Sequence, residues 1–226
     1  APNTVRVMTQ LANARYFDGI RFHRVIDNFV IQGGDSNTKN TYVDANGDGR
    51  GDAGDNIWGQ GGPGFEFDDE FSALSFYTGK GQLAMAKSSD DTNGSQFFVT
   101  DSTTSTLRNL GFQRTIWGQL VRGFDVLDNI LAINQFYSGP ATGGNAGGDQ
   151  PLNAPVITSA RVIVNNRDAV LRVSAPAGVA ATVTVTGSDG TTPVQRQFTV
   201  TGTTNPLNDP PFLGPIAKGY VSPVNT

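Results

Sequence analysis

One stretch near the amino end decides the fold, and it reads Phe22-His23-Arg24-Val25-Ile26-Asp27-Asn28-Phe29-Val30-Ile31-Gln32-Gly33-Gly34-Asp35. Its two apolar runs, 22–25 and 29–32, are separated by Asp27-Asn28, so they predict two strands joined by a turn. Alternation along the strands puts Arg24 and Gln32 on polar positions beside the apolar Phe29 and Val30. A fixed guanidinium beside an apolar wall is typical of a binding site. The alternative is a strand whose arginine faces solvent.

Further strands and two helices follow from the spacing of apolar residues. Strand-like runs recur at residues 83–86, 96–100 and 115–121. Residues 5–12 carry apolar side chains at helical spacing after Asn3, an acceptable N-cap, and residues 124–131 repeat that spacing after Gly123. Two helices flanking several short strands predict a closed or half-closed β-barrel with helices covering its ends.

Composition excludes several classes of function. The chain has 226 residues and a formal net charge of −4, so no general basic surface is expected to bind nucleic acid. It has no cysteine and one histidine, which excludes disulfides, thiolate chemistry and multi-histidine metal sites. No apolar run approaches the roughly 18 residues of a membrane span. Residues 59–64 match the GxGxxG pattern but lack the strand-to-helix context of a dinucleotide site.

Two more blocks identify a family. They read Met85-Ala86-Lys87-Ser88-Ser89-Asp90-Asp91-Thr92-Asn93-Gly94-Ser95-Gln96-Phe97-Phe98 and Thr115-Ile116-Trp117-Gly118-Gln119-Leu120-Val121. With the 22–35 stretch they closely resemble the cyclophilin-type peptidyl-prolyl isomerases, from Ala1-Pro2-Asn3-Thr4-Val5 to about Ile130. The resemblance implies a mainly β fold, an eight-stranded antiparallel barrel capped by two helices, with an outer groove for a proline-containing peptide.

The resemblance also implies the site residues. Arg24 takes the place of the family's catalytic arginine. Substrate-binding positions fall on Phe29, Val30, Gln32, Ala86, Lys87, Gln96, Phe98, Asn109, Leu110 and Arg114. Rotation about an X-Pro bond is slow because amide resonance sets a barrier of about 18–20 kcal/mol. A donor aimed at the prolyl nitrogen stabilises the twisted form without a covalent step, so no cofactor is expected for catalysis.

Three groove positions depart from the family pattern. Lys87 stands where asparagine is usual, Asn109 where an aromatic residue, commonly tryptophan, is found, and Arg114 where histidine is frequent. We therefore expect catalysis to be retained, with a preference for an acidic residue near the substrate proline and weak binding of cyclosporin-class inhibitors. The alternative is a structural or adhesive cell-surface module that keeps the fold and the groove without turnover. His23 is expected to be a core residue, and the carboxylates at 68–70 an exposed turn.

The family has a β-hairpin before the block that begins at Ala1. Without those strands two barrel neighbours would have unpaired edges, which invite pairing with another chain. The sequence therefore predicts a trimmed product, an incompletely determined sequence, or a barrel completed by a partner chain or separate segment.

An insertion at about residues 36–61 contains a candidate calcium loop. Oxygen side chains recur at EF-hand-like spacing, Gly49 occupies loop position 6 and Arg50 offers its backbone carbonyl. The predicted ligands are Asp44, Asn46, Asp48, Arg50, Asp52 and Asp55. The ion is expected to be structural, and the alternative is a solvated Asp/Gly loop. An affinity suited to millimolar calcium indicates an extracytoplasmic protein, whether secreted, periplasmic or on the cell surface. A bacterial source is expected from the resemblance of the C-terminal region described next.

Composition divides the chain into four parts. The isomerase-like domain covers residues 1–137, and a Gly/Pro-rich linker is expected at 138–155. Residues 156–202 alternate Val and Thr and predict a small β-sandwich-like module, which resembles the immunoglobulin-like or cadherin-like modules of large secreted bacterial proteins. Residues 203–226 are expected to be a further linker or a tail.

Overall fold

The computed structural model describes residues 1–39, 58–72, 75–102, 107–134, 136, 148–164, 176–188 and 191–202. Described residues up to 164 belong to one unit and those from 176 to 202 to a second. Within these ranges, no helix combines the length and apolar character that a membrane span requires.

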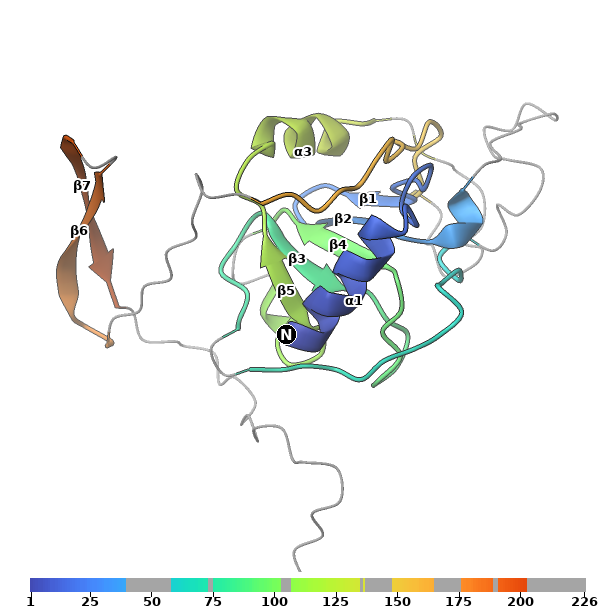
Figure 1. Ribbon diagram of the computed structural model, residues 1–226, viewed down its shortest axis with the longest axis horizontal. Helices are drawn as coiled ribbons and strands as arrows, with labels where there is room; N and C mark the ends of the chain where they lie inside the picture. The colour runs from blue at the N-terminus through green and yellow to red at the C-terminus, as the bar shows by residue number, and fades with distance from the viewer. Residues whose placement is uncertain are drawn as a thin grey trace, which may run out of the picture. The chain divides into compact units, whose positions relative to one another are not determined.

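Five short strands form the antiparallel sheet of the first unit (Figure 1). They are β1 (Arg24–Ile26), β2 (Val30–Gly33), β3 (Gln82–Met85), β4 (Phe97–Thr100) and β5 (Ile116–Gln119), in the order β1-β2-β4-β3-β5. The strands expected from the sequence are confirmed, each within a few residues of its predicted bounds. Among the described residues this sheet is open rather than a closed eight-stranded barrel.

The register of the strands separates a core face from a groove face. Ile31 and Leu83 both pair with Val99, whereas Gln32 and Ala84 both pair with Phe98. Because successive side chains point to opposite faces, the odd-numbered residues of β2, β3 and β4 share one face and the even-numbered residues share the other. The odd face carries the main apolar core, and the even face carries the groove described below.

Two helices pack against the odd-numbered side chains, as the sequence predicted. Leu127 and Leu131 of α3 (Phe124–Leu131) contact the cluster of Val25, Ile31 and Val99. Met8 of α1 (Pro2–Asn13) packs with Phe17, Ile20 and Met85 in a second cluster. In Figure 1, α3 lies across the upper end of the strands and α1 passes in front of them.

The start of α1 is capped by a residue far along the chain rather than by Asn3. The helix begins at Pro2, and no side chain of the N-terminal segment caps it. Instead Glu70 accepts hydrogen bonds from the backbone N–H groups of Asn3 (3.0 Å) and Thr4 (2.6 Å) and from the Thr4 hydroxyl (2.7 Å). Partial burial raises the pKa of Glu70, but these bonds and the positive N-terminus outweigh it and lower the pKa.

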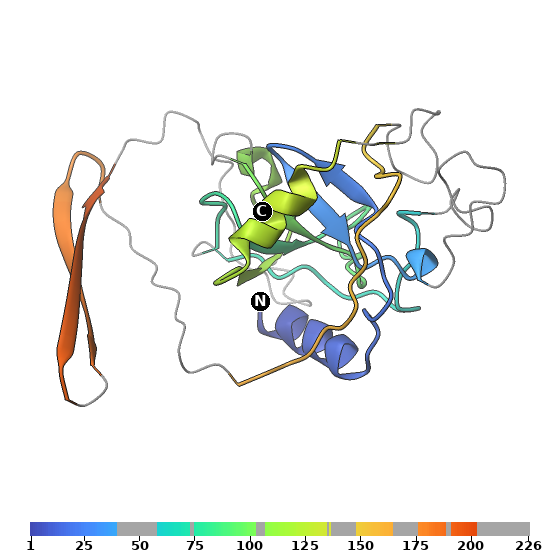
Figure 2. The same cartoon turned by 90° about the horizontal axis from the view of Figure 1, so that it is seen from above.

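Residues 148–164 are packed on the first unit, which differs from the predicted linker and module boundary. The carbonyls of Asp149 and Pro155 accept from the N–H groups of Val25 (2.8 Å) and Phe22 (2.9 Å), and Ile157 exchanges two hydrogen bonds with Gly19 and Ile20. The segment therefore covers the outer edge of β1 (Figure 2). The Gly/Pro-rich composition predicted a linker here, because backbone hydrogen bonds to a strand leave no signal in the side chains.

The opposite edge of the sheet is formed by β5, and no described segment pairs with its outer side. Among the described residues β5 pairs only with β3. An apolar cavity of about 500 Å³ lies beside it, lined in part by Met8, Phe97, Trp117 and Ile157. Completion of the barrel by another segment stays a prediction.

The second unit is described as a single hairpin, β6 (Ala180–Ser188) with β7 (Pro193–Thr201). Val/Thr alternation predicted these strands, and the register pairs Val183 with Phe198. Nearly every residue of both strands is exposed, and no second sheet packs on them within residues 176–188 and 191–202. The sandwich itself stays a prediction.

The cap on α1 generates a stability test. Glu70→Ala leaves two N–H groups of the first helical turn without their acceptor, so we expect the free energy of unfolding in urea to fall by about 1–2 kcal/mol. Glu66→Ala is the matched control, because Glu66 is exposed and caps no helix. Equal stability of the two variants would contradict the capping role.

Candidate active site

The even-numbered face of the sheet opens into a groove of about 1280 Å³. This exceeds the roughly 300–1,000 Å³ of a site for a small molecule, so its size suits an extended peptide. Ten residues predicted from the sequence line it: Arg24, Phe29, Val30, Gln32, Ala86, Lys87, Gln96, Phe98, Leu110 and Arg114. Asn109, at the middle of the 3₁₀ helix η3 (Arg108–Leu110), is exposed and does not line this groove.

An apolar floor lies at one part of the groove. Val30 and Phe98 are almost fully buried and pack with the partly buried Phe29 and Leu110. The ring of Tyr77 stacks on Phe98, with centroids 6.3 Å apart and planes inclined by 19°. Burial raises the pKa of the Tyr77 hydroxyl well above its usual range, although the nearby charge of Arg114 acts in the opposite direction. The floor is thus an apolar surface of two aromatic and two aliphatic side chains on which a prolyl ring can pack.

Arg24 is held at the edge of this floor. The register places it opposite Gln32, so both side chains reach the groove face. Its Nε donates to the Asp149 carboxylate at 3.1 Å, and its side chain is 27% exposed. Sequence reasoning missed Asp149, because the residue stands in a Gly-rich run that carries no motif.

A chain of amides forms the next part of the groove. The Gln32 side chain donates to the side-chain oxygen of Gln96 (3.0 Å), and the Gln96 amide donates to the carbonyls of Gly59 (2.8 Å) and Gly61 (2.9 Å). These bonds fix the wall formed by residues 59–66, which the sequence analysis did not assign to the site. The glycine-rich pattern noticed at 59–64 was the available signal.

Asp35 holds that wall in place from beneath. Its fully buried carboxylate accepts the N–H groups of Asn37 (2.7 Å), in the 3₁₀ helix η1 (Ser36–Thr38), and of Gly59. Burial raises the pKa of Asp35, while these N–H bonds act to lower it. Gly61 lies so close that a Cβ there would collide with the Asp35 carboxylate. The same exclusion applies at Gly34, where φ is +93° and a Cβ would meet the Ser95 carbonyl.

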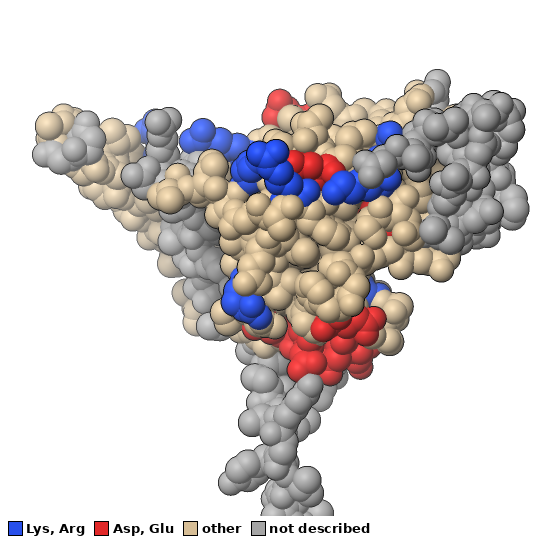
Figure 3. All heavy atoms as spheres, turned by 45° about the vertical axis from the view of Figure 1, so that its right-hand side comes forward, with Lys and Arg blue, Asp and Glu red and all other residues tan. Residues whose placement is uncertain are grey.

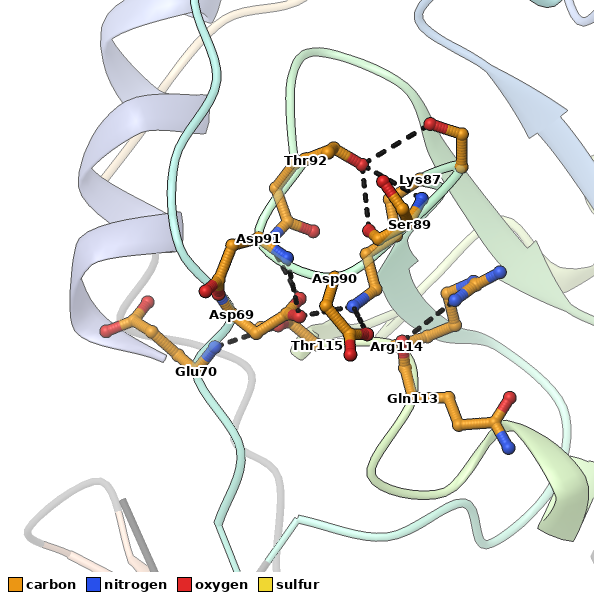
Figure 4. A network of polar contacts seen from close by, with 12 residues as sticks. Asp69, Glu70, Lys87, Ser89, Asp90, Asp91, Thr92, Gln113, Arg114 and Thr115 are labelled. Atoms are coloured by element: carbon orange, nitrogen blue, oxygen red, sulfur yellow. Dashed lines mark hydrogen bonds and ion pairs between the residues drawn. The ribbon is translucent and has the colours of Figure 1, made fainter. Parts of the chain in front are cut away.

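Lys87 lines the groove, but its ammonium group is turned into an acidic network (Figure 4). The Nζ atom bonds to Asp69 and Asp90 and lies 5.5 Å from the centre of the Phe71 ring. Partial burial raises the pKa of Asp69, but its bonds from Lys87, Asn93 and the Asp91 N–H outweigh burial and lower it. The Lys87 ammonium group therefore has a structural role, and a substrate contact through the rest of the side chain stays a prediction.

The acidic turn at 68–70 makes several hydrogen bonds to other loops, whereas the sequence predicted an exposed turn. Asp69 exchanges backbone-to-carboxylate hydrogen bonds with Asp91, and Glu70 donates its N–H to the Thr115 hydroxyl at 3.0 Å. Glu66, Asp68, Asp90 and Asp91 are exposed around it. Figure 3 shows a dense cluster of acidic side chains on one part of the surface.

His23 is a core residue, as predicted. It is fully buried, and burial lowers its pKa to about 4, with a further contribution from the charge of Arg24. The neutral imidazole therefore persists at physiological pH. The predicted calcium ligands at 44–55 lie outside the described residues.

Comparisons with known proteins agree with this geometry. The family model "Cyclophilin type peptidyl-prolyl cis-trans isomerase/CLD" matches residues 1–162. Peptidyl-prolyl cis-trans isomerase-like 1 of Homo sapiens is 38% identical over 130 residues, 58% of this chain and 67% of that protein. Peptidyl-prolyl cis-trans isomerase CYP18-1 of Arabidopsis thaliana is 35% identical over 151 residues, 67% of this chain and 76% of that protein.

A solved structure gives the same match of fold. A cyclophilin type peptidyl-prolyl cis-trans isomerase of Cryptosporidium parvum, crystallised in the presence of the dipeptide Ala-Pro, has a TM-score of 0.55 and 27% identity. The similarity covers 73% of this chain and 87% of that one.

Proposed function

The chain belongs to the cyclophilin-type peptidyl-prolyl cis-trans isomerases, and we propose that it isomerises X-Pro bonds of extracytoplasmic proteins through its arginine, Arg24. The observation that carries the proposal is that Arg24 and the apolar floor of Phe29, Val30, Phe98 and Leu110 line one groove. A prolyl ring on that floor puts its amide within reach of a permanently charged donor.

The reaction then follows from elementary amide chemistry. Twisting the X-Pro bond breaks resonance, so the prolyl nitrogen becomes pyramidal and its lone pair, delocalised in the planar amide, becomes localised on the nitrogen. A guanidinium N–H directed at that lone pair binds the twisted form more strongly than either planar isomer, which lowers the barrier selectively. Among the described residues the Gln32 side chain makes one hydrogen bond, to Gln96, so its oxygen and second N–H can bind the peptide backbone while the apolar floor holds the ring.

Replacing the arginine tests this mechanism. We expect Arg24→Ala to lower kcat/KM for a proline peptide on the order of 10²-fold, as for loss of one key donor to a transition state. The rate is measured by NMR exchange between the cis and trans signals. Arg6→Ala, on the exposed side of α1 away from the groove, should leave the rate unchanged. An inactive wild type would favour the adhesive or structural alternative, and an active Arg24→Ala would overturn the arginine mechanism.

Arg114 supports a preference for acidic residues beside the proline. It lines the groove, and the one hydrogen bond that its guanidinium makes to a described residue goes to the adjacent Gln113 carbonyl (2.9 Å). By contrast Arg24 and Lys87, the other described cations of the groove, each have a carboxylate partner. A substrate carboxylate can therefore bind Arg114 without displacing a carboxylate of the protein, as it would at Arg24 or Lys87.

A charge reversal tests this preference. Peptides that carry Glu or Lys next to proline should differ about threefold in kcat/KM on the wild type, as expected for a partly exposed ion pair. Arg114→Gln should remove the difference and Arg114→Glu should reverse it, with the effect declining at high salt. An unchanged preference in Arg114→Glu would contradict the assignment.

We further propose that the 44–55 loop binds a structural Ca²⁺ ion and that the protein acts outside the cytoplasm. The basis is the loop sequence, with oxygen side chains at Asp44, Asn46, Asp48, Asp52 and Asp55. The weak affinity expected of such a loop suits the millimolar calcium found outside cells.

Thermal unfolding tests the ion. A ligand that binds only the folded state raises the melting temperature, so millimolar Ca²⁺ should stabilise the wild type. An Asp44→Asn, Asp48→Asn double variant should lose the shift, whereas Glu66→Gln, outside the loop, should keep it. No shift in the wild type would remove the calcium proposal.

A further inference from the structure

Asp149 makes two hydrogen bonds to adjacent residues of β1. Its carboxylate Oδ2 accepts from Nε of Arg24 at 3.1 Å, and its backbone carbonyl accepts from the N–H of Val25 at 2.8 Å. The backbone bond fixes the main chain of Asp149 against the same strand that carries Arg24. Because the main chain of Asp149 is bonded to Val25, its short side chain holds the carboxylate at a fixed place beside Arg24.

The segment around Asp149 is anchored on the far side as well. Gln150 is 2% exposed, and Pro151 forms a bridge with Phe136, which packs on the core cluster beneath α3. Farther on, the Pro155 carbonyl accepts from the Phe22 N–H at 2.9 Å. Asp149 thus belongs to a segment that is buried at Gln150, Pro151 and Ala154 and is held by several backbone hydrogen bonds to residues 19–25.

The geometry of the bond suits orientation of the guanidinium. Arginine has a long flexible side chain, and a partner at Nε restricts it while leaving both Nη atoms to other acceptors. The described residues provide no hydrogen-bond acceptor for either Nη atom of Arg24, and the side chain lines the groove. Asp149 therefore binds Nε of Arg24 and leaves the N–H groups of both Nη atoms for the substrate.

We propose that Asp149 is a positioning residue, which orients the Arg24 guanidinium toward the prolyl nitrogen. The proposal rests on the function proposed above for Arg24. The carboxylate does not touch the substrate. It reduces the number of arginine conformers, so that more of the bound peptide meets the donor in a productive orientation.

A double-mutant cycle tests the coupling. Asp149→Ala should lower kcat about tenfold with little change in KM, because the guanidinium loses its orientation while the floor still binds the peptide. Asp149→Asn, which keeps an acceptor oxygen, should retain more activity than Asp149→Ala. In an Arg24→Ala background, Asp149→Ala should cause no further loss of kcat.

Asp18→Ala is the matched control. Asp18 accepts from the guanidinium of Arg161 (2.9 Å) and from the Ala160 N–H (3.1 Å), so it anchors the other end of the same segment outside the groove. If Asp149 only stabilises the segment, both variants should lower the melting temperature, and activity should follow the folded fraction in both. The positioning role predicts that Asp149→Ala alone lowers kcat in fully folded protein.

Three results would overturn the proposal. They are a kcat of Asp149→Ala equal to or above that of the wild type, an equal tenfold loss in the Arg24→Ala background, and an equal loss in Asp18→Ala. The function proposed for Arg24 is judged separately, by wild type against the single Arg24→Ala variant.

Discussion

The structure depends on the pairing register of β1, β2, β3 and β4. In that register Arg24 faces Gln32, and both Gln32 and Ala84 face Phe98, so the arginine and the apolar floor share one face. The opposite face must bury Ile31, Leu83 and Val99 against α3. Slipping one strand by a single residue would move its core side chains into solvent and its groove residues into the core. Stability and the site are therefore set by the same constraint.

Carboxylates hold the loops around this sheet. Glu70 caps α1, Asp35 binds the wall at residues 59–61, and Asp69 binds Lys87 and the 91–93 turn. Each acts by accepting N–H groups from residues distant in sequence, which fixes a loop without a large apolar contact. Three of the chain's 20 acidic residues thus each hold a loop or a helix start in place.

Much of the sheet and the groove could be predicted from the sequence, because alternation and the 85–98 block determine which side chains share a face. The missed contacts have no periodic signal. Asp149 is 125 residues from Arg24, and Glu70 is 67 residues from Asn3. The family motif places Lys87 at the groove, but the direction of its long side chain depends on the acidic residues around it, Asp69 and Asp90. A boundary based on composition failed at 148–164, where backbone hydrogen bonds to residues 19–25 hold the segment.

In the proposed mechanism a permanently charged arginine in a shaped groove lowers the barrier without any proton transfer. The most direct test of this mechanism is the pH dependence of kcat/KM for a proline peptide. Because arginine does not titrate and buried His23 has a pKa of about 4, the account predicts a flat profile from about pH 5.5 to about pH 8.5. A sigmoidal or bell-shaped profile with an inflection inside that range would show that a titrating acid or base takes part, and would contradict the account.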